Sequence, residues 1–104
     1  MKIYIVLWGS ATHDCDEEEV YSYTNVHNVY TSLDSARTGL VGLKDLFYDE
    51  IVNDPNFDEE DREDVENHTF VKGSVEDNEF IINTTFGCTT QQINIRIVEK
   101  EIIE

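Results

Sequence analysis

The sequence predicts an α+β fold: one antiparallel β-sheet of about five strands, in the element order ββαβββ, with a single long helix packed on one face. Three observations predict it. The 104 residues suit one hydrophobic core rather than two. Only one segment, near the middle of the chain, has the three- and four-residue spacing of a long helix. The other apolar stretches are short, and in the C-terminal third they alternate with polar residues. We therefore expect residues 1–104 to form a single compact domain.

The first third of the chain predicts two antiparallel strands. Residues 2–8, KIYIVLW, form a nearly continuous apolar run, as in a strand that is covered on both faces. Residues 9–19 contain five acids and predict a loop. Residues 20–30, VYSYTNVHNVY, are rich in Val and Tyr, so we expect a second strand that pairs antiparallel with the first.

The long helix follows and is the clearest local pattern. Thr31 is a candidate N-cap, and Asp34 would be the acid of a capping box. Gly39 and Gly42 each destabilise a helix by about 1 kcal/mol relative to Ala, which close approach to the sheet would offset. Pro55 ends the helix, because proline disfavours helical geometry in the residue before it. One apolar stripe runs along the helix: Leu33, Ala36, Leu40, Leu43, Phe47 and Ile51.

Three strands are predicted after a strongly acidic segment. Residues 56–67, NFDEEDREDVEN, contain few apolar residues, so a short helix capped by Asp58, an ordered turn and a mobile loop are all compatible with them. Residues 77–78, Asp-Asn, predict a tight hairpin turn, and residues 87–90 form a second connection. The strands themselves are expected at residues 68–75, 79–86 and 91–98.

The charge balance excludes several classes of function. Twenty-three acidic and seven basic residues give a net charge of −16, which disfavours direct binding to nucleic acid or to an anionic membrane surface. No apolar run approaches the roughly 20 residues of a membrane span. The apolar stretch at residues 3–8 is shorter than the roughly 7–15 residues of a secretory signal. We expect the two cysteines, Cys15 and Cys88, to be free thiols in a reducing cytosol.

Acidic and histidine-containing segments suggest a metal site, but their spacing does not fit one. A calcium-binding EF-hand needs Gly at its sixth position and a bidentate acid at its twelfth. Counted from Asp14, these positions hold Glu19 and Asn25. A zinc set would have to combine residues whose spacing matches no common structural site: His13, Cys15, His27 and His68. We therefore expect no metal and no cofactor.

The sequence also contains no catalytic motif. A glycine-rich phosphate loop, a GxSxG nucleophile and a cysteine with histidine support are all missing, so we expect no enzymatic activity and no catalytic residue. Aromatic residues of the two N-terminal strands could stack nucleic-acid bases, but such platforms lie beside Lys and Arg, and only Lys2 is near. We expect them to form the core and its rim instead: Tyr4, Trp8, Tyr21, Tyr23 and Tyr30.

The candidate partner-binding surface is acidic, because the acids are concentrated in two expected loops, at residues 13–19 and 54–67. Further acids lie near the C-terminus of the predicted helix, where the helix dipole makes negative charge unfavourable, so we expect a reason other than stability. The alternative is a solvated face that keeps a small protein soluble. The candidate residues are Asp54, Asp58, Glu59, Glu60, Asp61, Glu63, Asp64 and Glu66, with Asp14, Asp16, Glu17, Glu18 and Glu19, and with Asp45, Asp49 and Glu50.

The amount of charge favours mimicry of nucleic acid. Duplex DNA carries about one charge per 1.7 Å, so 16 charges correspond to roughly 27 Å of duplex. A compact chain of this length has a diameter of roughly 33 Å, whereas solubility needs a net charge of only about 2–8. We therefore expect the surplus charge to attract a basic, nucleic-acid-binding protein, with fast and salt-sensitive association.

In these respects the chain resembles the small inhibitors that bacteriophages encode against host defence, namely anti-CRISPR proteins and other DNA mimics. The resemblance covers size, charge and the opening MKIYIVLW…VYTSLDSA, and ten Ile and eight Asn against two Ala indicate an AT-rich genome. It implies a non-enzymatic protein in the cytoplasm of a bacterial host. Its carboxylates would stand where DNA phosphates sit and block a CRISPR effector, an RNA-guided nuclease.

A second function is compatible with the same sequence. The chain could be an interaction module of phage or bacterial origin whose contact is apolar, with acidity serving only solubility. An open sheet face or an edge strand such as residues 91–98 would make that contact. High salt should weaken binding through the acidic surface and hardly affect binding through an apolar one.

Overall fold

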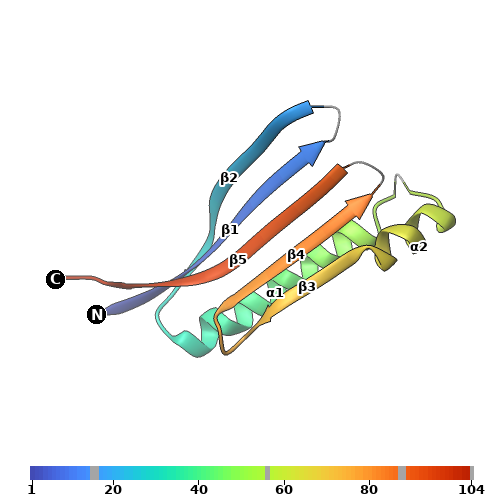
Figure 1. Ribbon diagram of the computed structural model, residues 1–104. Helices are drawn as coiled ribbons and strands as arrows, with labels where there is room; N and C mark the ends of the chain where they lie inside the picture. The colour runs from blue at the N-terminus through green and yellow to red at the C-terminus, as the bar shows by residue number, and fades with distance from the viewer. Residues whose placement is uncertain (15–16, 56, 87–88, 104) are drawn as a thin grey trace.

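The fold is one antiparallel five-stranded sheet with two helices (Figure 1). The computed structural model describes residues 1–14, 17–55, 57–86 and 89–103, and of residues 13–14, 17–23 and 86 it describes the backbone alone. The strand order is β2-β1-β5-β4-β3. The elements are β1 (Lys2–Asp14), β2 (Glu17–Tyr30), α1 (Leu33–Val52), α2 (Glu59–Asn67), β3 (Thr69–Ser74), β4 (Glu79–Phe86) and β5 (Thr89–Glu101). The predicted α+β class, with one long helix on one face of the sheet, is confirmed.

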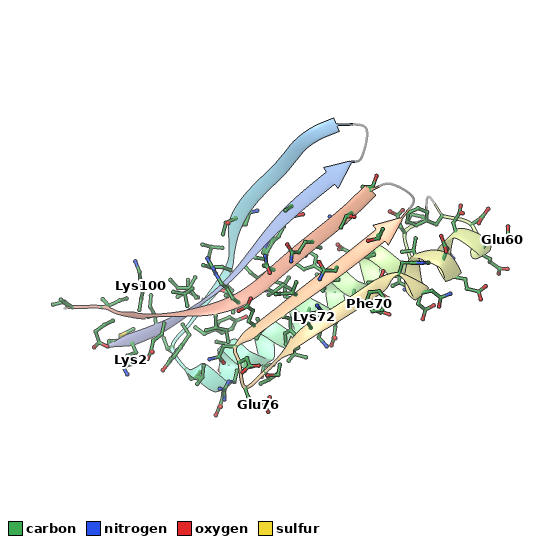
Figure 2. The ribbon with its side chains drawn as sticks, in the orientation of Figure 1. Lys2, Glu60, Phe70, Lys72, Glu76 and Lys100 are labelled. Atoms are coloured by element: carbon green, nitrogen blue, oxygen red, sulfur yellow. The ribbon has the colours of Figure 1, made fainter. Side chains whose placement is uncertain are left out.

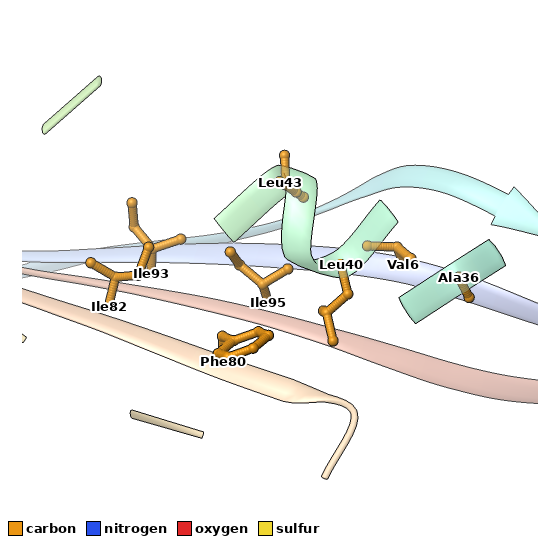
Figure 3. Close-up of a cluster of buried hydrophobic side chains, with 8 residues drawn as sticks. All are labelled: Val6, Ala36, Leu40, Leu43, Phe80, Ile82, Ile93 and Ile95. Atoms are coloured by element: carbon orange, nitrogen blue, oxygen red, sulfur yellow. The ribbon is translucent and has the colours of Figure 1, made fainter. Parts of the chain in front are cut away.

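The core lies between α1 and the face of the sheet that α1 covers (Figure 3). The predicted helical stripe is confirmed, since its central residues are buried and Phe47 and Ile51 pack half-buried against them. From the sheet, every second residue of β4 and β5 faces the helix. The buried cluster is Val6, Ala36, Leu40, Leu43, Phe80, Ile82, Ile93 and Ile95. Tyr4, Trp8 and Tyr30 pack at its rim, as expected, while the side chains of Tyr21 and Tyr23 lie outside the description.

The predicted loop at residues 9–19 is wrong over most of its length. Residues 9–14 continue β1, which pairs on both sides, with β2 and with β5, as far as Asp14↔Glu17 and Asp14↔Thr89. Two backbone ladders thus hold a segment whose composition disfavours strands, because sheet pairing outweighs weak local propensity. The described residues of the expected acidic loop at 13–19 thus belong to the ends of β1 and β2, which form a long hairpin. Cys15, Asp16 and Cys88 lie outside the described residues.

Helix α1 begins one residue later than predicted. Ser32, not Thr31, is the N-cap, and its Oγ accepts a hydrogen bond from the Ser35 backbone N–H at 3.1 Å. Asp34 then stands in the first turn instead of closing a capping box, because the N3 position is occupied by Ser35. Gly39 approaches the sheet as expected: a Cβ there would collide with the Tyr30 ring. Gly42 has open space around it, so that expectation fails.

The C-terminal half also follows the prediction, with small shifts. Of the three alternatives for residues 56–67, the short helix α2 is present, with Asp58 as its N-cap. The hairpin turn between β3 and β4 contains Asn78 at φ 57°, a left-handed conformation that Asn tolerates better than most residues. Arg37 Nε donates to Asn78 Oδ1 at 2.9 Å, which ties this turn to α1. Thr89 and Thr90 belong to β5 and not to the preceding connection.

Two further expectations are wrong, one about the overall shape and one about the edges of the sheet. The molecule measures 52 × 28 × 21 Å with a radius of gyration of 15.6 Å, longer than the compact shape expected. The cause is strand length, since the 13 residues of β1 alone extend over about 43 Å at roughly 3.3 Å per residue. In addition, residues 91–98 cannot serve as an edge strand, because β5 lies between β1 and β4; the edges are β2 and β3.

Candidate functional site: the acidic end

The topology gathers both acidic segments at one end of the molecule, which we call the acidic end. At this end β1 turns into β2, β4 is followed by β5, and α2 leads into β3 (Figure 1). The register agrees, since Asp14 pairs with Thr89 and Thr69 pairs with Thr84. The two acidic segments lie at opposite edges of the sheet, beside β2 and beside β3, and both chain termini lie at the other end.

Helix α2 (Glu59–Asn67) is stabilised more by its N-cap than by burial of its side chains. The Asp58 carboxylate accepts a hydrogen bond from the Asp61 N–H at 2.9 Å, and three acids in the first turn match the positive end of the helix dipole. Val65 is the only residue of α2 that is buried. The helix joins β3 through Thr69, whose Oγ1 donates to the Val65 carbonyl at 2.6 Å. Most of its surface is therefore left to display charge.

The carboxylates of α2 point mainly into solvent. Glu60 marks its outer end, far from Lys2 and Lys100 near the termini (Figure 2). Arg62, the only basic residue of the segment, is partly buried, and its Nε has no hydrogen-bond partner within the described part of the chain. Asp54 and Asp61 are half-buried, and six of the candidate acids are exposed: Asp58, Glu59, Glu60, Glu63, Asp64 and Glu66.

Charge density at α2 approaches that of duplex DNA, although that of the whole protein does not. Sixteen charges along 52 Å correspond to one per about 3.3 Å, roughly half the density of a duplex. From Glu59 to Glu66, six acids and Arg62 leave five net charges over seven helical rises of about 1.5 Å, or one per about 2.1 Å. The duplex value is about one per 1.7 Å. The comparison with DNA therefore applies to α2 and not to the protein as a whole.

One carboxyl in this cluster, that of Asp61, has a raised pKa. Partial burial, followed by repulsion from Asp58, Glu60 and Asp64, raises the pKa of Asp61 above its ordinary value of 3.8. At the other end of α2, His68 caps the helix, and its Nδ1 lies 3.4 Å from the Asp64 carboxylate, an ion pair only when the ring is protonated. The cluster is thus self-repelling.

The candidate acids of α1 occupy the helix end where the dipole opposes them. Asp49 and Glu50 lie in the last turn, which contains no basic residue. The Asn53 side-chain amide donates to the Asp49 carboxylate at 2.6 Å, and Lys44 pairs with Asp45 at 2.7 Å. Glu50 has no ion pair among the residues that the structure describes, so its charge is uncompensated there.

A groove of about 630 Å³ opens between the end of α1, α2 and the sheet. Trp8, Phe47 and Phe57 line it with aromatic rings, and the Trp8 and Phe47 ring centroids are 4.9 Å apart at a 59° tilt. Glu50 and Asp54 are its acidic lining residues, so the groove belongs to the acidic end. Sequence reasoning missed it, because its lining comes from both helices and from three strands that are distant in sequence. No local pattern could have indicated it.

The remaining predicted site residues are placed as follows. Asp14, Glu17, Glu18 and Glu19 have their backbones at the ends of β1 and β2, at the hairpin tip. His27 lies on β2 and His68 beside β3, at opposite edges of the sheet, so these two cannot share a zinc ion. Among residues 1–14, 17–55, 57–86 and 89–103, no three His, Cys, Asp or Glu are grouped as for a metal ion. Nor is any helix of this part long and apolar enough to cross a membrane.

Comparison with known proteins adds no relative: no protein-family model, no curated protein and no solved structure matches the chain.

Proposed function

We propose that the protein is a non-enzymatic inhibitor that binds a basic nucleic-acid-binding protein through its acidic end and competes with DNA. The observation that carries the proposal is the charge spacing of α2, one net charge per about 2.1 Å, beside about 1.7 Å for duplex DNA. A helix stabilised mainly by its cap leaves its surface free for such a display. The acids at the end of α1 extend the same surface.

A partner suited to this surface has a DNA-binding channel lined by Lys and Arg. The carboxylates of α2 would occupy the positions of phosphates, and opposite charges would accelerate the encounter. An RNA-guided nuclease of a bacterial host, blocked by a phage-encoded inhibitor, is the first candidate, and other DNA-binding nucleases satisfy the same physics.

Competition with labelled duplex DNA tests this function. The protein is titrated into preformed complexes of the duplex with an RNA-guided nuclease or with another DNA-binding nuclease, and release of the duplex is followed by fluorescence anisotropy. We expect saturable release that weakens steeply between about 50 and 200 mM salt. Absence of release from every nuclease at low salt would contradict the proposal.

One observation favours a second function, an interaction module that binds through the bare face of the sheet. On this face, opposite to α1, Val26, Val29 and Phe70 are 61%, 48% and 60% exposed. Val29 and Val26 pair with Ile5 and Leu7, which point away from the core. A partner bound there would be held by apolar contact, so its affinity should change little over the same range of salt.

A further inference from the structure

The groove at the acidic end has the size and shape of a binding site. Its volume of about 630 Å³ falls in the range of roughly 300–1,000 Å³ that is usual for ligand pockets. It is open to solvent, so a side chain from another molecule can enter it without any strand or helix moving.

The lining of the groove favours a cation. The Trp8 and Phe47 rings lie in contact with each other in the groove. Cations are attracted to the faces of aromatic rings. Glu50 and Asp54 supply negative charge, and no Lys or Arg is among the lining residues that the structure describes. An anion would be repelled here, and a purely apolar group would leave uncompensated the charge of Glu50, which has no ion pair among the described residues.

The floor of the groove offers hydrogen-bond acceptors. Ser10 is 5% exposed, and its Oγ accepts a long hydrogen bond of 3.4 Å from Gln91 Nε2. Thr84 is 7% exposed, and its Oγ1 donates to Thr69 Oγ1 at 3.3 Å. Hydroxyl and amide oxygens in these positions keep lone pairs for a donor-rich ligand. Guanidinium has five N–H donors in one plane and stacks on aromatic rings, whereas an ammonium is compact and strongly hydrated.

We infer that this groove binds the guanidinium group of an arginine side chain that the partner presents. The inference deepens the proposed function and rests on it, since the arginine would come from the same basic DNA-binding protein. The guanidinium stacks on the Trp8–Phe47 pair, its charge faces Glu50 and Asp54, and its inner N–H groups donate to the floor. The groove would thereby add a specific anchor to a surface that otherwise acts through long-range charge.

Trp8 makes the groove directly observable, because it is the only tryptophan of the 104 residues. Its fluorescence is recorded while N-acetyl-L-argininamide is added, with N-acetyl-L-citrullinamide as an uncharged isostere and N-acetyl-L-lysinamide as a compact cation. At the efficiency of a ligand of this size, we expect saturation with a Kd of about 1 mM for the arginine compound. We expect weaker binding of lysinamide and no saturable response to citrullinamide.

A matched pair of variants locates the response. Glu50→Gln should weaken argininamide binding about fivefold, whereas Glu76→Gln, in the turn between β3 and β4 at the other end of the molecule, should leave it unchanged (Figure 2). Equal responses to all three amides, or equal binding by Glu50→Gln and wild type, would overturn the inference. If the protein releases DNA but Trp8 does not respond to argininamide, the groove inference fails and the inhibitor proposal stands. If argininamide binds beside Trp8 but the protein releases no DNA, the groove inference stands and the inhibitor proposal fails.

Discussion

The two helices differ in what holds them in place. Helix α1 is 20 residues long and buries Ala36, Leu40 and Leu43 against the sheet, so its position is fixed by the core. Helix α2 has nine residues, buries only Val65 and relies on the Asp58 cap and on first-turn acids. Burial thus anchors α1 in the core, whereas α2 contributes little to the core and exposes a dense row of carboxylates. The acids Asp45, Asp49 and Glu50 of α1 likewise lie beyond its last buried residue, Leu43.

The largest test of this comparison removes one buried side chain from each helix. Leu40→Ala should lower the free energy of unfolding by about 2–5 kcal/mol, because it leaves a cavity in the centre of the core. Val65→Ala removes two methyl groups and should cost about 1.6 kcal/mol. Urea denaturation followed by far-UV circular dichroism measures both. Equal losses would mean that α2 is as much a part of the core as α1.

The next effect concerns the caps. Asp58→Ala should cost about 1 kcal/mol and act locally, by exposing the first N–H groups of α2. Hydrogen exchange should accelerate for the α2 amides and not for those of β5. Ser32→Ala, the matched change at α1, should accelerate exchange throughout the core. Asp58→Asn keeps the cap and should restore protection in α2, which separates capping from charge.

A smaller effect, of opposite sign, is expected at the end of α1. Glu50→Gln removes a negative charge from the helix end that disfavours it, and should raise the free energy of unfolding by about 0.3 kcal/mol. Thermal melting at low ionic strength measures it, with Glu76→Gln as the control. The same substitution is expected to weaken argininamide binding, so stability and binding should change in opposite directions. A loss of stability in Glu50→Gln would remove the argument that this acid is retained for function.

The smallest effect depends on pH. Because the pKa of Asp61 is raised above 3.8 in the folded protein, the folded state holds this proton where the unfolded state has released it. The free energy of unfolding should therefore fall as pH rises through the window just above 3.8. Asp61→Asn should remove that part of the slope and be slightly more stable than wild type at neutral pH. Identical slopes for the two proteins would contradict the crowding of this carboxyl.

Periodic burial explains which parts of the fold could be predicted from the sequence. The apolar stripe of α1 and the alternation of apolar and polar residues in β4 and β5 are visible in the local sequence, because each of these elements buries one face. The type and order of the elements could therefore be predicted. The length of β1 could not be predicted, because Asp14 at its end is held by pairing with Thr89 of β5, some 75 residues away in sequence. The length of β2 in turn depends on its pairing with β1. The central position of β5 likewise depends on non-local pairing and not on its own residues.

The candidate site could be predicted only in part, for the same reason. The acids of α2 are adjacent in sequence, so their concentration was visible, but nine residues with one buried side chain give almost no helical periodicity. The aromatic groove is assembled from Trp8, Phe47, Phe57 and strand residues of the C-terminal third, which meet only in the folded protein. Total charge suggested mimicry of DNA by the whole protein, whereas the 52 Å length confines that density to α2.

If the acidic end competes with DNA as proposed, the location of the charge should decide potency, and not its amount. Two triple variants test it at the same net charge: Glu59, Glu60 and Glu63 changed to Gln on α2, and Glu76, Glu79 and Glu101 changed to Gln away from it. Asp58 is left intact so that the cap of α2 is kept. In the DNA-release assay, we expect the α2 triple to lose about tenfold in potency, at roughly 0.5 kcal/mol per charge, and the control triple to match wild type. Equal potency of the two triples would contradict competition with DNA through α2.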